Sequence, residues 1–315
     1  AATTWLRVAL CGAPMVLVTL AGNGWMRGVQ DTARPLRYVL AGNGLSAVLC
    51  PVLVHGTGMG LVGSAFANVV GQTLGAALFL VALVRAARAN AVALRPAPAV
   101  LRAQLALGRD LLARSLAFQA SFLSAAAVAT RFGAATAAAH QIVLQMWFFQ
   151  ALVLDAVAIA AQALVGAALG SPDGAQRARA LAGQVTRYGL VLGIAFGVLF
   201  AALSGVLPPV FTPDAAVLAE VPVAWWFFTA MQPIAGVVFA LDGVLLGAGD
   251  AAFLRTSTIA AAVFGFLPLT WASLAFGWGL AGIWSGLAAM MLIRFTAVAL
   301  RARSGHWVVT GAVRS

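Results

Sequence analysis

Long apolar stretches alternate with short polar connections along the whole chain. Each stretch is long enough to cross a bilayer as one helix, which takes about 17–25 residues. The stretches do not alternate apolar and polar residues as the strands of a membrane barrel do. We therefore predict an all-α polytopic membrane protein with nine transmembrane helices. They span residues 5–26, 38–55, 61–84, 115–131, 136–169, 188–207, 225–250, 255–276 and 280–300.

The longest polar connection, residues 87–114, divides the predicted helices into two groups. It is rich in arginine and contains Pro96 and Pro98, so we interpret it as a cytoplasmic linker between two lobes. Within it, residues 101–112 have the pattern of a short helix lying on the membrane surface. The predicted domains are a partial first lobe at 1–86, the linker at 87–114, a second lobe at 115–303 and a cytoplasmic tail at 304–315.

The first part of the chain recurs 219 residues later without gaps. Secondary transporters are commonly built from repeated halves. The first three predicted helices pair with the last three, and the counterparts of the middle three would precede Ala1, so we expect three further helices there. The matching positions are Pro14 and Pro233, Gly24 and Gly243, Gly28 and Gly247, Asp31 and Asp250, Gly58 and Gly277, Gly60 and Gly279, and Gly63 and Gly282.

The charged residues are few and unevenly placed. The chain has 63% hydrophobic and 9% charged residues, with 19 basic residues against 8 acids. All the basic residues are arginines, and most lie in the connections, where the positive-inside rule accounts for them. We therefore exclude nucleic acid as a partner. The arginine-rich connections follow every second predicted helix from the first onward, so we expect the chain as given to begin on the outer side of the membrane.

Three segments resemble the multidrug and toxic compound extrusion (MATE) transporters. They are residues 25–43 (WMRGVQDTARPLRYVLAGN), 137–166 (AAAHQIVLQMWFFQALVLDAVAIAAQALVG) and 241–250 (LDGVLLGAGD). The resemblance is strongest to the DNA-damage-inducible F subgroup. It implies a twelve-helix, two-lobe fold, of which this chain holds helices 4–12. It also implies an ion-coupled antiporter that exports lipophilic, often cationic, compounds without a cofactor, in exchange for protons or sodium.

The family resemblance bears on two candidate site residues. Asp242 matches an acid in the tenth helix that sodium-coupled members use for their cation. Gln119 stands where those members have a seventh-helix Glu, which puts a family-type sodium site in doubt.

Asp242 is also a candidate from its position alone. A carboxylate deep in an apolar span costs about 2.5–3.5 kcal/mol and usually has a function. At helical spacing Phe228, Met231 and Asp242 share one face, so we predict an aromatic and thioether wall that suits a flat apolar cation. The alternative is a core helix with one acid bonded to a neighbour. Asn23 is the counterpart of Asp242 in the repeat, and we interpret it as polar lining or as a helix–helix contact.

A polar stripe runs along the helix predicted at 136–169. Gln141, Gln145 and Asp155 lie on one helix face, with His140 beside them. Such a stripe faces a water-filled cavity or holds helices together by hydrogen bonds. We predict a cavity role for Asp155, and we expect His140 to be structural, with a proton relay as the alternative.

Pro14 and Pro233 occupy matching places in the repeat and each removes an intrahelical hydrogen bond. We predict that they kink their spans and serve as hinges; tolerated membrane prolines are the alternative.

Three other functions compete with export. A lipid-linked sugar flippase would need arginines inside the cavity, whereas the arginines lie mainly at helix ends. A membrane-embedded enzyme would need a nucleophile with a base or a metal cluster, and the sequence has no such motif. A scaffold or inactive fragment is the third. We expect a monomeric, non-enzymatic transporter of small xenobiotics, without bound metal, embedded in the lipid of a bacterial inner (plasma) membrane.

Overall fold

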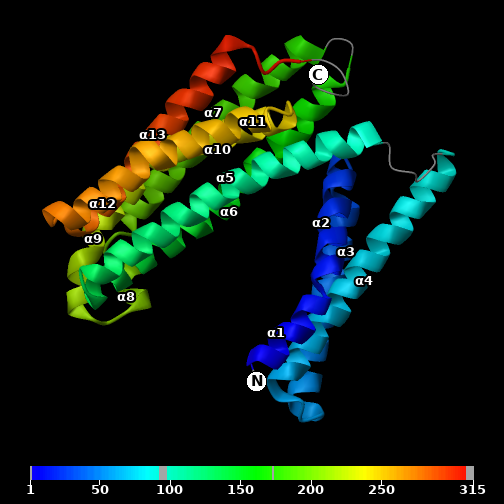
Figure 1. The fold of residues 1–315 in the computed structure, drawn as a ribbon, viewed down its shortest axis with the longest axis horizontal. Helices are drawn as coiled ribbons and strands as arrows, with labels where there is room; N and C mark the ends of the chain where they lie inside the picture. The colour runs from blue at the N-terminus through cyan, green and yellow to red at the C-terminus, as the bar shows by residue number, and fades with distance from the viewer. Residues whose placement is uncertain (1, 92–97, 172–173, 310–315) are drawn as a thin grey trace. The chain divides into compact units, whose positions relative to one another are not determined.

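The computed structural model describes residues 2–91, 98–171 and 174–309, and every regular element in these ranges is a helix (Figure 1). The prediction of an all-α fold is confirmed. In chain order the helices are α1 (Ala2–Cys11), α2 (Ala13–Gly28), α3 (Ala33–Pro51), the π-helical turn η1 (Val52–Gly56), α4 (Gly60–Ala89), α5 (Pro98–Arg131), α6 (Ala134–Leu169), α7 (Gly174–Ala202), α8 (Leu207–Phe211), α9 (Ala215–Ala230), α10 (Gln232–Gly247), α11 (Ala251–Ala261), the π-helical turn η2 (Ala262–Phe266), α12 (Leu267–Phe276) and α13 (Gly279–Ser304).

Nine crossings can be counted within the described ranges. Seven helices are long and apolar enough to cross a membrane unbroken, and two further crossings are made by bent pairs, α1 with α2 and α9 with α10. The bends are 43° and 49°, and each falls just before a proline, Pro14 or Pro233. Because proline has no N–H to continue the helical ladder, the bends follow from the sequence. The hinge motion itself stays a prediction.

The chain divides into two compact units, residues 1–97 and 98–315. The predicted linker at 87–114 differs from this division, since α4 continues to Ala89 and α5 already begins at Pro98. The separate surface helix predicted at 101–112 is wrong, because those residues belong to the unbroken α5. Proline is well suited to the start of a helix, and the buried Asp110 ties this part of α5 to the second unit. Residues 92–97 lie outside the described ranges.

The predicted tail, 304–315, is partly packed against its unit. Trp307 is fully buried, and its indole N–H donates to the carbonyl of Ala302 at 2.9 Å. Residues 310–315 are outside the part of the chain that the structure describes.

In the first unit, α4 packs against α2 and α3. Its Phe79 is buried, close to Gly22 of α2, and its ring meets that of Tyr38 of α3 edge-on at 5.2 Å. Gly42 of α3 and Gly71 of α4 bring their backbones together, since a Cβ on Gly42 would lie 2.7 Å from the Gly71 carbonyl oxygen. Small residues of this kind are typical of contacts between membrane helices.

The 219-residue repeat is visible in the local geometry. The bounds of α2 and α10 differ by that offset at both ends. After α2 the backbone N–H of Asp31 donates to the carbonyl of Met26 at 2.9 Å, and after α10 that of Asp250 donates to Leu245 at 2.8 Å. The match is not complete, because η1 and η2 fall at positions that do not correspond. Left-handed glycines recur at the same offset: Gly58 and Gly60, then Gly277 and Gly279.

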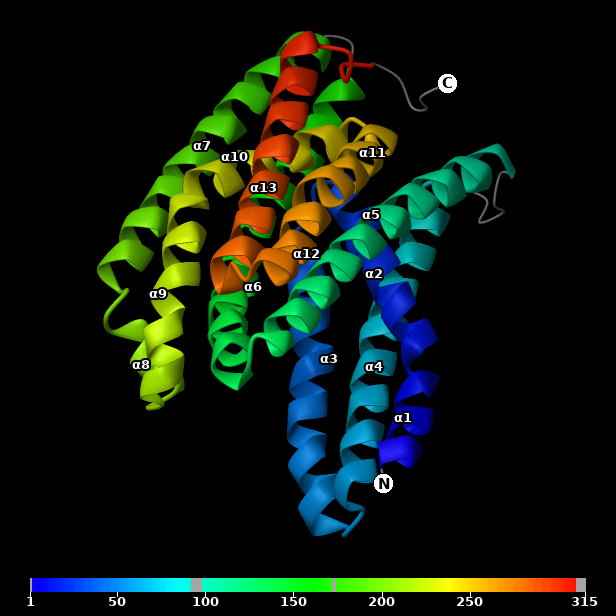
Figure 2. The ribbon, with the colours of Figure 1, turned by 60° about the vertical axis from the view of Figure 1, so that its left-hand side comes forward.

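In the second unit, α10 packs mainly against α7 and α6 (Figure 2). A Cβ on Gly236 would overlap the carbonyl oxygen of Gly189 on α7, and one on Gly247 would lie 2.5 Å from the carbonyl oxygen of Gln162 on α6. These glycines let the α10 backbone approach closely, which maximises dispersion contact. These contacts flank Asp242, in the middle of α10, and hold its backbone in a fixed position.

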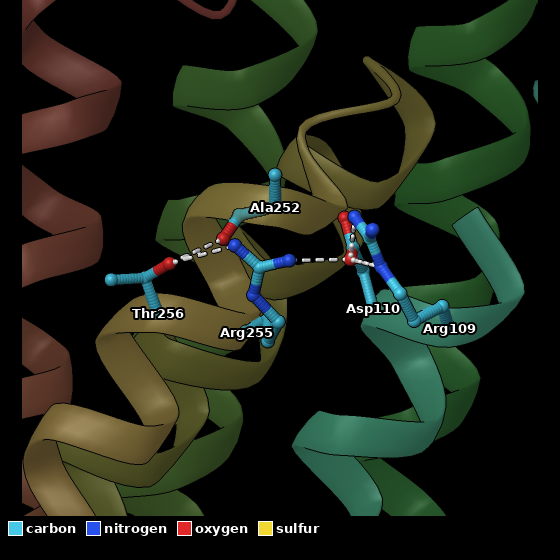
Figure 3. A network of polar contacts seen from close by, with 5 residues as sticks. All are labelled: Arg109, Asp110, Ala252, Arg255 and Thr256. Atoms are coloured by element: carbon cyan, nitrogen blue, oxygen red, sulfur yellow. Dashed lines mark hydrogen bonds and ion pairs between the residues drawn. The ribbon is translucent and has the colours of Figure 1, made fainter. Parts of the chain in front are cut away.

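Helix α5 is tied to α11 by a charged cluster (Figure 3). Buried Asp110 accepts hydrogen bonds from Arg109 of its own helix at 2.9 Å and from Arg255 of α11 at 2.6 Å. Arg255 also contacts the hydroxyl of Thr256, which donates to the carbonyl of Ala252. Asp110 is one helical turn from Arg114, so this cluster fixes the rotation with which α5 presents Arg114 to the interior.

We expect Gly236→Ala to destabilise the second unit by about 1–3 kcal/mol, because the methyl group would overlap the α7 backbone. Gly183→Ala on α7 is the matched control. A Cβ there meets nothing within 4 Å, so alanine should stabilise the helix by about 0.5–1 kcal/mol. Chemical unfolding of the purified protein in detergent measures both. Equal stabilities would show that the α7–α10 backbone contact is not tight.

Candidate functional site

Asp242 of α10 is shared by two arginines from different helices. The Nη2 groups of Arg114 on α5 and of Arg294 on α13 both donate to its Oδ2 atom. Asp242 and Arg294 expose only 5% and 2% of their surface, so these ion pairs lie in the interior of the second unit. A buried charge has lost its hydration, so the carboxylate needs the guanidinium groups, and they need the carboxylate, to remain charged inside the protein.

Phe118 lies beside both guanidinium groups. Its ring centroid is 4.9 Å from Cζ of Arg294 and 5.7 Å from Cζ of Arg114. The negative face of an aromatic ring attracts a cation at these distances, and more strongly where water is absent. Phe118 therefore offsets part of the excess positive charge that two arginines bring to one carboxylate.

The cluster retains unused hydrogen-bonding capacity. Within the described chain, the buried Nε atoms of Arg114 and Arg294 and the Oδ1 atom of Asp242 have no hydrogen-bond partner. Buried polar groups are normally satisfied, and exceptions call for a functional explanation. The arrangement is therefore a charged cluster with donors and an acceptor available at the edge of a cavity.

A cavity of about 270 Å³ lies against this cluster, between α5, α6, α10 and α13. Asp155 of α6 lines it together with Asp242, Arg114 and Arg294. Asp155 is exposed and, among the described residues, forms no ion pair within 4.0 Å, although its charge interacts with those of Arg114 and Asp242. The remaining wall is mostly aromatic: Phe118, Phe122, Trp147, Phe148 and Phe239.

Comparison with known proteins identifies the family of this chain. The MatE family model matches residues 111–271, about half of the chain, including α6, α10 and most of α5. The chain belongs to the MatE family. The predicted family is therefore confirmed, and because members of this family are membrane transporters and not enzymes, so is the prediction that the chain is not an enzyme.

The relatives of this MatE chain come from plants and bacteria. It is 36% identical over 310 residues to "Protein DETOXIFICATION 44, chloroplastic" of Arabidopsis thaliana, covering 97% of the chain and 58% of the relative. It is 29% identical over 312 residues to "DNA damage-inducible protein F" of Escherichia coli (strain K12), covering 97% of the chain and 66% of the relative. The chain thus spans less than two thirds of the length of these relatives.

A solved structure supports the same fold. A MATE protein crystallised in its bent conformation superposes with a TM-score of 0.84, at 18% identity, over 96% of this chain and 67% of that one. The resemblance found in the sequence is therefore confirmed by the family model, by relatives and by fold.

The MatE structure brings two of the predicted site residues together. Asp242 and Asp155 line the same cavity, although they lie on different helices. Gln119 of α5 and Gln141 and Gln145 of α6 are exposed and do not line it. The polar stripe predicted on α6 is therefore divided, and only its Asp155 end reaches the cavity.

The predicted wall of Phe228 and Met231 does not lie beside Asp242. Phe228 is buried in the core against Phe200 and Trp225, with ring centroids 4.8 and 5.9 Å away. The bend at Met231 ends α9 and begins α10, so the single helix face on which the prediction rested does not exist. The aromatic wall instead comes mainly from α5 and α6.

His140 is buried on α6, where its ring packs against Trp284 of α13 with centroids 6.0 Å apart. In the described structure neither of its ring nitrogens has a hydrogen-bond partner, and it does not line the cavity beside Asp242. Asn23 lies on α2 in the first unit and is half-buried.

Sequence reasoning missed the two arginines. Arg294 lies in the middle of an apolar span, with Met291 and Phe295 nearby in sequence, and an arginine at that depth is a signal of function in its own right. Arg114 was assigned to the linker because α5 was expected to begin after it. The view that arginines lie mainly at helix ends therefore needs correction, since these two line the cavity.

We expect Asp242→Asn to destabilise this MatE protein by about 3–5 kcal/mol, because two buried guanidinium groups would lose their counter-charge. Chemical unfolding in detergent measures the loss. Asp155→Asn is the control and should change stability little, since Asp155 is exposed and lacks an ion pair among the described residues.

A double variant tests the cause. Adding Arg294→Met to Asp242→Asn should recover part of the stability, because one unpaired buried charge is removed. If Asp242→Asn unfolds like the unmodified protein, the ion pairs do not stabilise the second unit.

Proposed function

We propose that this chain forms the core of an ion-coupled secondary transporter that exports small organic compounds by alternating access. Membership of the MatE family, the repeated local geometry of α2 and α10, and the proline-associated bends support this proposal. The main observation behind the proposal is that one aromatic cavity is lined by two acids in different environments. Asp242 is held by two arginines, whereas Asp155 is exposed.

Asp155 is the carboxylate that binds the substrate cation and the coupling ion in turn during transport. A substrate cation or a coupling ion reaching Asp242 would have to displace two guanidinium groups from a buried site. Asp155 needs no such displacement, and its carboxylate borders the cavity. This assigns the exchange step to Asp155 and the structural role to Asp242, although by sequence Asp242 is the acid that matches the cation-binding position of sodium-coupled members.

The substrate is a small lipophilic cation with a flat apolar body. Phe122 and Phe148 meet edge to face at 5.4 Å, and with Phe118 and Phe239 they provide aromatic faces and edges around Asp155. Such walls bind apolar cations by burial and by cation–π attraction, with a carboxylate supplying the counter-charge.

The coupling ion is a proton rather than sodium. Only Asp155 and Asp242 offer side-chain oxygens among the cavity residues, and Asp242 is bonded to two cations. Hard metal cations usually take about six oxygen ligands, whereas a proton needs one basic atom. A proton and a cationic substrate compete for Asp155, so uptake of one favours release of the other, as antiport requires.

Location and partners follow from the same proposal. The transporter works in an energised membrane, for which we propose the plasma membrane, and it acts as a monomer on xenobiotic compounds. A lipid-linked sugar flippase would need free arginines for a diphosphate, and both cavity arginines are bonded to Asp242.

Reconstituted protein and the fluorescent cation ethidium test the proposal. A proton gradient, and not a sodium gradient, should drive ethidium transport. Asp155→Asn should reduce proton-driven transport at least about tenfold, because an amide cannot exchange a proton with a cation. Glu220→Gln in α9, an acid that does not line the cavity, is the control and should transport normally.

The two acids should also be distinguishable in this assay. Asp155→Asn should lose transport while keeping its unfolding midpoint, whereas Asp242→Asn should lose both. Normal proton-driven transport by Asp155→Asn would remove Asp155 from the coupling step.

A further inference from the structure

A groove of about 590 Å³ runs along the second unit between α7, α10 and α13, separate from the cavity at Asp242. Its walls are mainly apolar, with Leu190 from α7, Ile234 and Val237 from α10, and Phe295 from α13. Three arginines line it: Arg179, Arg187 and Arg303.

Two of the three arginines, Arg179 and Arg303, lie at one end of the groove. Arg303 lies in the last turn of α13, and Arg179 lies near the start of α7. A Cβ on Gly305, just beyond α13, would be 3.5 Å from Nη2 of Arg179, so the two helix ends are close. Arg187 is two turns further along α7, from where its long side chain can extend toward the same end.

These arginines carry uncompensated charge. All three are exposed, and within the described ranges none has an acidic group within 4.0 Å and no acid lines the groove. The positive-inside rule predicts that this end of the unit faces the cytoplasm, where anionic lipid headgroups are available. An apolar channel with two guanidinium groups at its end and a third two turns along its wall is complementary to a molecule with acyl chains and an anionic headgroup.

We propose that this groove binds one anionic phospholipid, with its phosphate at Arg179, Arg187 and Arg303 and an acyl chain along the apolar walls. Basic pockets between transmembrane helices are known to take such headgroups. The groove also includes Pro233, at the bend between α9 and α10. A bound lipid therefore contacts the residue at which α10 changes direction.

Native mass spectrometry of the purified protein tests the proposal, with phosphatidylglycerol and phosphatidylcholine of identical acyl chains added in equal amounts. We expect one phosphatidylglycerol to be retained in preference to phosphatidylcholine. Arg179→Gln and Arg303→Gln should each lower its affinity about fivefold, since each arginine near a membrane surface contributes about that factor.

Two matched pairs of variants separate the groove from general surface effects. Arg177→Gln removes an exposed arginine from the same turn of α7 outside the groove, and it should leave lipid retention unchanged. Gly183→Leu fills the groove without changing charge, because a Cβ at Gly183 meets nothing within 4 Å, and it should reduce retention. Gly108→Leu on α5, equally open, is its control.

Several results would overturn the proposal. Equal retention of the two lipids, or an equal effect of Arg177→Gln and Arg179→Gln, would reduce the arginines to a general charge effect. Displacement of the lipid by inorganic phosphate alone would show an anion site without acyl recognition. A dimer that dissociates in Gly183→Leu would assign the groove to a second copy of the chain. Unfolding midpoints of all variants identify any that fail to fold, and Arg303→Gln then provides the independent measurement.

Discussion

The second unit depends on one carboxylate that is shared by two guanidinium groups. Asp242 joins α10 to α5 through Arg114 and to α13 through Arg294, three helices that are far apart in sequence. A buried ion pair is costly to form and far more costly to break, so its main effect is to fix which arrangement of helices is allowed. Asp110 strengthens this constraint. Its bond to Arg255 anchors α5 to α11 at a point one helical turn before Arg114.

Close packing extends along the whole of α10. Gly193 of α7 meets its start at Gln232 and Pro233, and glycine contacts to α6 and α7 hold the rest, leaving no room for a side chain. Its start follows the break at Met231. There the side-chain amide of Gln232 donates to the backbone carbonyl of Phe228 at 3.1 Å and so satisfies a carbonyl in the last turn of α9. Backbone groups freed in a membrane need such partners. Asp242 is thus fixed in place, and the preceding segment carries the bend.

The sequence predicts those features that depend on local pattern. The apolar spans, the Pro14 and Pro233 bends and the 219-residue repeat all follow from composition and spacing. It did not predict that α5 begins at Pro98, because arginines such as Arg102 and Arg109 made the segment resemble a polar linker with a short surface helix. It also placed Phe228 beside Asp242, because a continuous helix was assumed across Met231. The partnership of Arg114 and Arg294 with Asp242 links residues 128 and 52 positions apart, which no local pattern encodes.

In the proposed mechanism, the positions of the two acids explain why one cavity contains both. A carboxylate that must release a proton or a substrate in each cycle cannot also hold three helices together, because every release would leave Arg114 and Arg294 unpaired in the interior. Separating these tasks solves the conflict: Asp242 faces two arginines inside the unit, while Asp155 borders the cavity, exposed and near enough to Arg114 for their charges to interact. Neutralising Asp155 then changes the net charge of the cavity while the helices around it stay joined.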